Sequence, residues 1–513
     1  MRKSLIAIAA AAALLLSGCA GGNGDPSPGG PPAASEVDRD ARLSIGTLST
    51  PATWDAAKNV GGPEPAMLRL VYDTLIEVDE NNELVGGAAE SWTTEDGGVS
   101  YILTLRDDIA FTDGAPLNAE AVKANLDRAL TLEDGTLRAS LGNVASVDAT
   151  DEFTVTITQK VPDVTLPVLL TDRAGMVMAP SSFASGEVTR PVGSGEYVWV
   201  AESPGVSVTL DRNPDYRDAD HVLLAGVDIR AMEDPVARLN AIRTKAVDMT
   251  FVGPEQVDEA KALPGISSFD VKGRSLRVIY VNKDLEPAFG DPDVRMALNK
   301  AIDREGIANG VLFGAAEPAY QLRPEGGAGF SEAFDSAITY DPEGARELLQ
   351  KAGYGEGLSF NFVTQPRFQK EAEAIQASYS AIGVDMTIEI LPGAGAGTAL
   401  WYDKTASIGM ANFDGRLDIG LAYQTFFVEG TAYNPSNILD EDLIAMIGTQ
   451  AGLVDPAERQ RMHDDMATLI ATSPLGAWPV VWGYEPVLYT DEVVGVKPFQ
   501  TGFPALKGVG KSQ

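Results

Sequence analysis

One stretch of this chain decides its fold: Ala89-Glu90-Ser91-Trp92, then Ser100-Tyr101-Ile102-Leu103-Thr104-Leu105-Arg106, then Phe111-Thr112-Asp113-Gly114-Ala115-Pro116-Leu117. Residues 100–105 alternate with a period of two and include aromatic and β-branched side chains, which predicts a strand. Asp113-Gly114 is typical of a turn. Outside this stretch, Arg42-Leu43-Ser44-Ile45-Gly46-Thr47 begins as an extended run, and Phe153-Thr154-Val155-Thr156-Ile157-Thr158 alternates like a strand.

Three helices are predicted from capping residues and apolar spacing. Asp234-Pro235 opens the first with a capping acid and a proline at the first helical position. Asp341-Pro342 opens the second, which Gly353 ends, and the third covers about 293–304. The expected buried faces are Val236, Leu239, Ile242 and Ala246 in the first helix, Ala345, Leu348, Leu349 and Ala352 in the second, and Val294, Ala297, Leu298, Ala301 and Ile302 in the third. Strands and helices alternate, so the fold class is mixed α/β.

The composition is that of a large acidic globular protein. The chain has 513 residues, of which 44% are hydrophobic and 22% charged, enough for two or three domains. Its formal net charge of -34 would repel phosphate backbones, which argues against nucleic acid as a partner. Beyond the N-terminus no apolar run approaches the about 18 residues that a membrane span needs.

The N-terminus has the layout of a secretory signal. Arg2 and Lys3 precede an apolar run at 5–16, and Leu16-Ser17-Gly18-Cys19 resembles a bacterial lipobox. Residues 1–18 are therefore expected to be a removed lipoprotein signal peptide, with Cys19 diacylated. Residues 19–41, rich in Gly, Pro and Ser, are expected to form a flexible tether.

Patterns that carry catalysis or bind metals are missing from the sequence. It contains two histidines, His221 and His463, and a single imidazole without a second ligand or an oriented nucleophile carries little chemistry. Because Cys19 is the one cysteine, Cys-based zinc and iron–sulfur sites are excluded. Nucleophile elbow, Walker and Rossmann fingerprints are absent. The sequence predicts no enzyme, no cofactor and no metal site.

The opening stretch strongly resembles the signature of family 5 extracellular solute-binding proteins, the dipeptide, oligopeptide and nickel class. The resemblance spans roughly 42–505, in order and with sensible spacing. Its further motifs lie at 191–197, 211–216, 246–248, 293–304 and 340–354.

The resemblance implies a periplasmic-binding-protein-like fold, with two α/β lobes and a ligand cleft between them. Lobe 1 would hold 42–270, with an extra subdomain at about 60–185. Lobe 2 would hold 271–483, and the segment 484–513 would return to lobe 1. The crossings near Val271 and Trp482 would form the hinge.

The implied function is capture of a small molecule for import. The protein would be a monomer, anchored by lipid to the outer face of the cytoplasmic membrane. It would bind peptides or peptide-like compounds and deliver them to ABC permease and ATPase subunits, because ligand contacts made only in the closed form shift the open–closed equilibrium.

The expected ligand contacts are aromatic residues together with a loop after the first strand. Peptide-binding members carry a Trp-x-x-Asp-Tyr type segment whose aspartate pairs with the ligand ammonium. Here the corresponding stretch begins at Asp418, the anchoring aspartate is not evident, and Asp414, Glu429 or another acid would have to substitute. The candidate contacts are Trp54, Asp55, Tyr423, Phe426, Phe427, Trp482 and Tyr484.

Two alternatives remain open. An oligosaccharide receptor of the same family would use stacked aromatics and neutral hydrogen-bonding groups. A secreted hydrolase, for example one acting on cell walls, would need a clustered catalytic constellation.

Overall fold

The computed structural model describes residues 37–59, 64–79, 82–327, 329–331, 338–392, 395–497 and 505–512. The predicted signal peptide 1–18, the lipidation residue Cys19 and most of the predicted tether 19–41 lie outside these residues. The end of that tether is described: Val37 forms a bridge with Ser512, and the Asp38 amide donates to the Lys511 carbonyl at 2.8 Å. The folded chain is thus already anchored at Val37.

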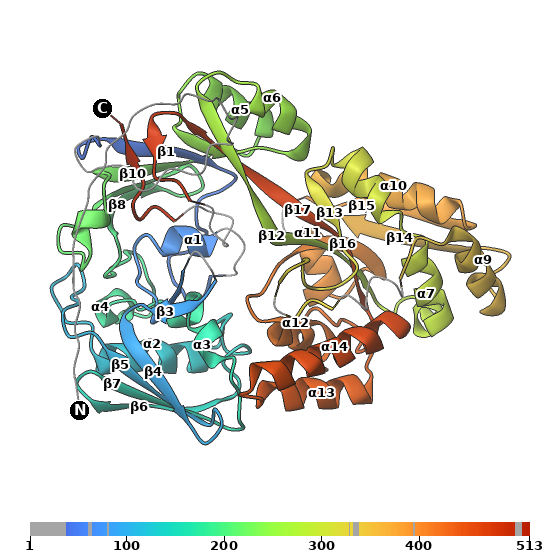
Figure 1. Cartoon of the computed structure of the whole chain (residues 1–513), viewed down its shortest axis with the longest axis horizontal. Helices are drawn as coiled ribbons and strands as arrows, with labels where there is room; N and C mark the ends of the chain where they lie inside the picture. The colour runs from blue at the N-terminus through green and yellow to red at the C-terminus, as the bar shows by residue number, and fades with distance from the viewer. Residues whose placement is uncertain are drawn as a thin grey trace, which may run out of the picture.

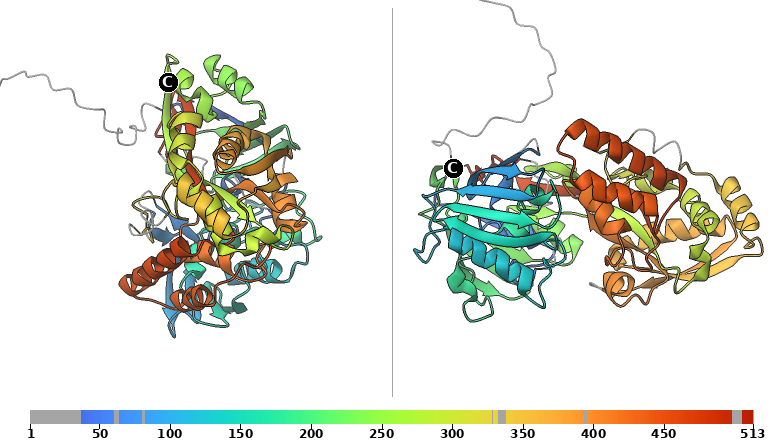
Figure 2. Two further views of the ribbon diagram at one scale, coloured as in Figure 1. Left: turned by 90° about the vertical axis from the view of Figure 1, so that its right-hand side faces the viewer. Right: turned by 90° about the horizontal axis from the view of Figure 1, so that it is seen from below.

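Two lobes lie side by side, joined by two long strands (Figure 1). β12 (Ile266–Val281) and β17 (Ala477–Thr490) are antiparallel and extend through both lobes. Within the described part of the chain, eleven strands form one sheet in the order β15-β14-β16-β12-β17-β11-β1-β10-β9-β8, with β13 beside β17. Figure 2 shows the two lobes from the side and from below. The predicted α/β class with two lobes is confirmed.

Lobe 1 contains one half of the large sheet. β1 (Arg42–Thr47) pairs in parallel with both of its neighbours, β10 and β11, and the next strands outward are antiparallel. The chain ends here too, because β18 pairs with β19. The other strands of this half are β8 (Tyr197–Ser203), β9 (Ser207–Arg212), β10 (Gly226–Ala231), β11 (Met249–Phe251), β18 (Val493–Val494) and β19 (Gly510–Lys511).

A smaller antiparallel sheet in lobe 1 contains the stretch that decided the fold. Its order is β4-β5-β7-β6, and α2 (Ala119–Thr131) packs on it. The predicted strand at 100–105 is confirmed as β5, whose Tyr101, Leu103 and Leu105 are buried on one face. The strands of this sheet and of the nearby β2–β3 hairpin are β2 (Ile76–Val78), β3 (Leu84–Gly86), β4 (Ala89–Glu95), β5 (Ser100–Leu105), β6 (Val144–Asp151) and β7 (Thr154–Gln159).

Lobe 2 contains the other half of the large sheet, covered by helices. β14 (Leu358–Thr364) pairs in parallel with β15 (Val384–Ile390) and β16 (Ile408–Asp414), and β13 (Ala316–Pro318) pairs with β17. The helices of this lobe are α7 (Pro292–Lys300), α9 (Pro342–Lys351), α10 (Gln369–Ser380), α11 (Gly395–Gly397), α12 (Ile419–Phe427), α13 (Glu441–Ala451) and α14 (Pro456–Thr472).

The predicted helices form, with two errors in the buried face of the first. Asp341 caps α9 through the Gly344 amide, and Gly353 follows the helix at a φ of 89°. In α5 (Pro235–Arg243) the predicted buried residue Val236 is 56% exposed, because the first turn lies at the edge of the stripe that Leu239 and Ile242 bury. Ala246 is exposed, because α5 ends at Arg243 and Ala246 lies in the turn that follows. The remaining helices of lobe 1 are α1 (Glu64–Leu68), α3 (Leu166–Leu169), α4 (Pro180–Phe183) and α6 (Val257–Lys261).

The connection between the lobes contains an irregularity. In β12, Ile266–Val271 pairs with residues 485–490 of β17 and Ser275–Tyr280 pairs with residues 477–483, with a register shift between Val271 and Ser275. Each lobe also has its own hydrophobic core. The shift lies where the sequence predicts the first crossing, while the lobe boundaries themselves stay a prediction.

Candidate functional site

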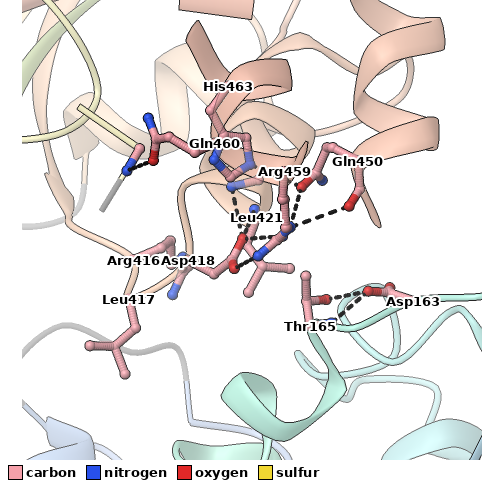
Figure 3. A network of polar contacts seen from close by, with 12 residues as sticks. Asp163, Thr165, Arg416, Leu417, Asp418, Leu421, Gln450, Arg459, Gln460 and His463 are labelled. Carbon is pink, nitrogen blue, oxygen red and sulfur yellow. Dashed lines mark hydrogen bonds and ion pairs between the residues drawn. The ribbon is translucent and has the colours of Figure 1, made fainter. Parts of the chain in front are cut away.

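The lobes meet at a second place besides the two long strands. The loop before α3 reaches the end of α13, where the Val164 amide donates to the Ala451 carbonyl at 2.7 Å. Asp163 holds this loop, because its Oδ1 accepts from the amide and the hydroxyl of Thr165 at 2.8 and 2.7 Å. Figure 3 shows the loop opposite a polar network of lobe 2. Residues near the strands β12 and β17, or near the hydrogen bond between Val164 and Ala451, therefore lie close to both lobes.

An ion pair between Asp418 and Arg459 forms the centre of that network (Figure 3). Asp418 caps α12, and its Oδ1 accepts from the Gly420 amide at 2.8 Å and from Arg459 Nη2 at 2.8 Å. Arg459 Nη1 donates to the other carboxylate oxygen. The two side chains are only 10% and 15% exposed. The carboxylate that opens the predicted ligand segment is thus neutralised within lobe 2.

His463 extends the same network. Its Nε2 lies 3.1 Å from Gln450 Oε1, which also accepts from Arg459 Nε at 3.0 Å. Burial lowers the pKa of the imidazole to about 4, and the charge of Arg459 acts in the same direction. His463 is therefore a neutral, structural side chain at pH 7.

The two acids that the sequence offered as substitutes are placed differently. Asp414 Oδ1 accepts from Asn412 Nδ2 at 2.9 Å at the end of β16. Glu429 is exposed after α12. Neither carboxylate forms an ion pair among the described residues.

Arg416 lies on the same loop as Asp418 but is left without an acid. Its side chain is exposed, and its guanidinium lies over the Phe413 ring at 5.4 Å from the centroid. Arg323 holds the backbone here, donating to the Arg416 carbonyl and, at 2.9 Å, to the Leu417 carbonyl. The backbone of Arg416 is thus held by Arg323, and its guanidinium nitrogens form no hydrogen bond with the described residues.

Arg173, in lobe 1, is a second arginine that forms no ion pair with the described residues. It lies in the short 3-10 helix η2 (Arg173–Gly175), and its Nη1 donates to the Asn59 carbonyl and, at 3.0 Å, to Thr136 Oγ1. Its Nε is buried without a hydrogen-bond partner. Burial lowers the pKa of this guanidinium, the carboxylate of Asp172 opposes that effect, and the charge of Arg416 adds to it. The two cations are near enough to repel each other.

A group of aromatic side chains accompanies the two arginines. Tyr433 packs against Trp401 with ring centroids 4.6 Å apart and against Phe413 at 5.7 Å. Burial raises the pKa of Tyr433 to about 12, while the charges of Arg416 and Arg173 oppose that rise. The phenol therefore stays protonated at pH 7. Nε1 of Trp401 is buried without a hydrogen-bond partner.

In lobe 1, the predicted contacts Trp54 and Asp55 are buried and paired. Trp54 Nε1 donates to Glu202 Oε2 at 2.8 Å. Asp55, 2% exposed, binds Arg128 through both carboxylate oxygens at 2.8 and 2.6 Å. Both side chains already have partners within lobe 1.

Tyr423, Phe426 and Phe427 lie in the core of lobe 2. All three are buried on α12, and Phe426 stacks on Tyr280 with centroids 5.9 Å apart. Phe426 also meets Phe413 edge to face at 4.6 Å. Phe426 also packs against Tyr433, with ring centroids 5.7 Å apart, so the core of lobe 2 extends to Tyr433.

Trp482 and Tyr484 lie on β17 near the register shift. Trp482 is buried opposite Leu276, and the Tyr484 hydroxyl donates to Glu317 on β13. For all seven predicted contacts, a role in binding stays a prediction.

The residues that the sequence did not single out are Arg173, Trp401, Arg416 and Tyr433. The sequence contains one indication that Arg416 is unusual, because it is the single Lys or Arg between Lys404 and Arg459. Arg173 gave no such signal, because only the fold brings it toward lobe 2.

No group of three or more His, Cys, Asp or Glu side chains in the described part of the chain is placed to hold a metal ion. Across the same residues, no helix is long and apolar enough to cross a membrane. A surface hollow lined by Glu373, Gln376 and Asp385 lies at α10 and the edge strand β15, and no residue of lobe 1 lines it.

Comparison with known proteins gives a consistent result. Residues 83–434 match the model of the bacterial extracellular solute-binding proteins, family 5 Middle. The glutathione-binding protein GsiB of Salmonella typhimurium is 28% identical over 457 residues, which cover 84% of this chain and 87% of that protein.

Solved structures share the fold. The peptide-bound DppA of Helicobacter pylori matches with a TM-score of 0.83 at 20% identity, covering 93% of this chain and 99% of that chain. AgaA of A. tumefaciens R10 in complex with agropinic acid matches with a TM-score of 0.83 at 21% identity, covering 92% and 99%. The chain therefore belongs to the family 5 bacterial extracellular solute-binding proteins, which are substrate-binding components of ABC importers and not enzymes.

Proposed function

We propose that this protein is a lipid-anchored extracytoplasmic receptor that captures peptides or peptide-like small molecules for an ABC importer. The observation that carries the proposal is the two-lobed architecture: each lobe has its own hydrophobic core, the long strands β12 and β17 join the lobes, and the Val164 amide of lobe 1 donates to the Ala451 carbonyl of lobe 2. A ligand held between the lobes links them, so its binding favours the closed form.

The hinge in this proposal is the pair of long strands. The register shift between Val271 and Ser275 interrupts the ladder that joins the lobes, and each lobe keeps its own core on either side of it. Rotation there would move lobe 2 (271–483) against lobe 1 (42–270 with 484–513) with little repacking. Diacylated Cys19 would keep the receptor at the membrane, close to its permease and ATPase subunits.

Peptide-like ligands are favoured by what the relatives bind. GsiB is named for glutathione, and the H. pylori DppA structure contains the peptide STSA. The AgaA structure contains agropinic acid. An oligosaccharide is the second candidate, because the adjacent rings of Trp401 and Tyr433 offer an aromatic surface for stacking.

Thermal unfolding with pools of ligands tests the proposal. Residues 20–513 would be freed of bound ligand by mild unfolding and refolding, then heated with peptides, glutathione or oligosaccharides. A ligand at 100 times its dissociation constant adds roughly 2.7 kcal/mol of stability. We expect the peptide or glutathione pools to raise the Tm. A rise with oligosaccharides alone would move the ligand to the second candidate, and no rise in any pool would contradict the proposal.

A further inference from the structure

The lobes touch each other at a place far from the strands that join them. The Val164 amide of lobe 1 donates to the Ala451 carbonyl of lobe 2 at 2.7 Å. Beside this bond, a Cβ on Gly452 would lie 3.4 Å from the Pro162 Cβ, so the two backbones are in contact. In Figure 1, α13 reaches the small sheet of lobe 1 at the bottom, whereas β12 and β17 join the lobes nearer the top. Rotation about the long strands therefore separates these four residues.

The lobe 1 side of the contact is held in place by hydrogen bonds within its own lobe. The Asp163 carbonyl accepts from Gln159 Nε2 at 2.7 Å and from the Tyr101 hydroxyl at 3.1 Å. The Asp163 amide donates to the Gly98 carbonyl at 3.3 Å. The loop is thus tied to the small sheet, and the position of the Val164 amide does not depend on lobe 2.

The lobe 2 side is the end of α13, where the last carbonyls of a helix have no partner within it. The Gln450 carbonyl accepts from the Leu453 amide and from Arg459 Nε, both at 3.2 Å. Arg459 is itself fixed by its ion pair with Asp418 (Figure 3). The next carbonyl, that of Ala451, accepts from the other lobe. Both halves of the contact are ordered within their own lobes, so little conformational entropy is lost when they meet.

Gly452 allows the close approach of the two lobes. Its φ of -91° and ψ of -1° are open to other residue types, so the backbone does not require a glycine here. The position requires space, because Pro162 lies against it. Gly448 lies one turn earlier on the same helix, and a Cβ there would meet open space. The two glycines of α13 therefore differ in whether they face lobe 1.

We propose that residues 162–164 of lobe 1 and residues 451–452 of lobe 2 form a latch that stabilises the closed form. This inference rests on the proposed function and adds a means of regulating it. The latch favours closure through contacts between the lobes themselves, so it raises the affinity for any ligand of the closed form by the same factor. One half-buried hydrogen bond and one van der Waals contact are weak, so the latch biases the open–closed equilibrium and opening stays reversible.

A disulfide across the latch tests its geometry. The mature chain 19–513 carrying Cys19→Ser has no other thiol, because Cys19 is the single cysteine. Pro162→Cys with Gly452→Cys places two Cβ atoms 3.4 Å apart, at the lower edge of the separation that a disulfide needs. We expect copper phenanthroline to oxidise this pair about tenfold faster or more than Pro162→Cys with Gly448→Cys, measured by gel mobility without reductant. Equal rates for the two pairs would overturn the latch.

A bulky side chain at position 452 tests whether the latch stabilises the closed form. Gly452→Ile places a stiff, branched side chain against Pro162, whereas Gly448→Ile places the same side chain in open space on the same helix. Spin labels at Glu120→Cys on α2 and Asp465→Cys on α14, two exposed positions in opposite lobes, report the separation of the lobes. We expect the short-distance population to fall about fivefold or more in Gly452→Ile and to stay unchanged in Gly448→Ile.

The same distance distribution in Gly452→Ile and in the unaltered protein would overturn the latch, and so would an equal shift in Gly448→Ile. Circular dichroism checks that both variants fold. If Gly452→Ile does not fold, the oxidation rates of the two cysteine pairs decide alone.

Failure of the proposed function looks different from failure of the latch. If no ligand pool raises the Tm while oxidation and distances behave as expected, the latch stands and the receptor function is wrong. If a ligand raises the Tm with the same half-saturating concentration in Gly452→Ile and in the unaltered protein, the latch is wrong while the receptor function stands.

Discussion

Arg416 and Asp418 lie two residues apart on one loop, yet only Asp418 forms an ion pair with another described residue. Asp418 is neutralised inside lobe 2 by a two-pronged ion pair with Arg459 and by the amides of α12. Arg416 forms no ion pair among the described residues, and its guanidinium lies over the Phe413 ring. A charge that is paired within its own lobe stabilises that lobe, whereas an exposed charge without an ion pair contributes little to its stability.

The largest effect should come from breaking the satisfied pair. Asp418→Ala removes the partner of a nearly buried arginine together with the N-cap of α12, so we expect the free energy of unfolding to fall by about 3–5 kcal/mol in urea denaturation. Glu458→Gln breaks the exposed Arg461–Glu458 pair on α14 and should cost under about 1 kcal/mol. Equal effects of the two substitutions would contradict the comparison.

The same network should make stability depend on pH through His463. Burial and the charge of Arg459 hold its pKa at about 4, below its usual 6.5, while Asp418 and Asp464 oppose them. The unfolded chain therefore binds a proton first as pH falls, and stability decreases from pH 6.5 toward 4. We expect this loss to be about 1–3 kcal/mol smaller in His463→Gln. Denaturation curves at pH 7 and 4.5 check this, and parallel losses in both proteins would refute it.

Glu196 is a buried carboxyl group in lobe 1 that forms no ion pair with the described residues. Its Oε2 has no hydrogen-bond partner, and burial raises its pKa to about 8, with Glu77 and Asp73 adding to the effect and Lys507 opposing it. The folded protein keeps a proton that the unfolded chain has lost, so this group reduces stability as pH rises from 4.5 to 8.

Glu196→Gln should remove that loss. We expect the variant to be about 1–3 kcal/mol more stable than the unaltered protein at pH 8.5. At pH 4.5 the folded carboxyl is protonated and the unfolded one is half protonated, so the difference should fall below about 0.5 kcal/mol. Urea denaturation at the two pH values measures the difference. A variant less stable at pH 8.5 would show that the carboxylate has a partner in solution.

The smallest effect on stability should come from Arg416 itself. Its guanidinium makes no ion pair among the described residues and repels Arg173, so Arg416→Gln should change the free energy of unfolding of the ligand-free protein by no more than about 0.5 kcal/mol. A loss comparable to that of Asp418→Ala would make Arg416 a structural residue and contradict the contrast between the two positions.

Most of the fold could be predicted from the sequence, and little of the site. The strand at 100–105 and the helix that starts at Pro342 follow from side-chain periodicity and from caps, which act over a few residues. The exposure of Val236 could not be predicted in this way, because it depends on which edge of α5 faces the sheet. Phe426 is buried against Tyr280, which only the packing of lobe 2 reveals, and its role in binding stays a prediction.

The sequence by itself determined the α/β class, the order of the elements and the family, because local periodicity and motif spacing are written along the chain. Tertiary structure alone decided which charges are neutralised. Asp418 meets Arg459, and Asp55 meets Arg128, through packing of segments far apart in the sequence. Electrostatic pairing depends on distance and burial in space, so no spacing along the chain could reveal it.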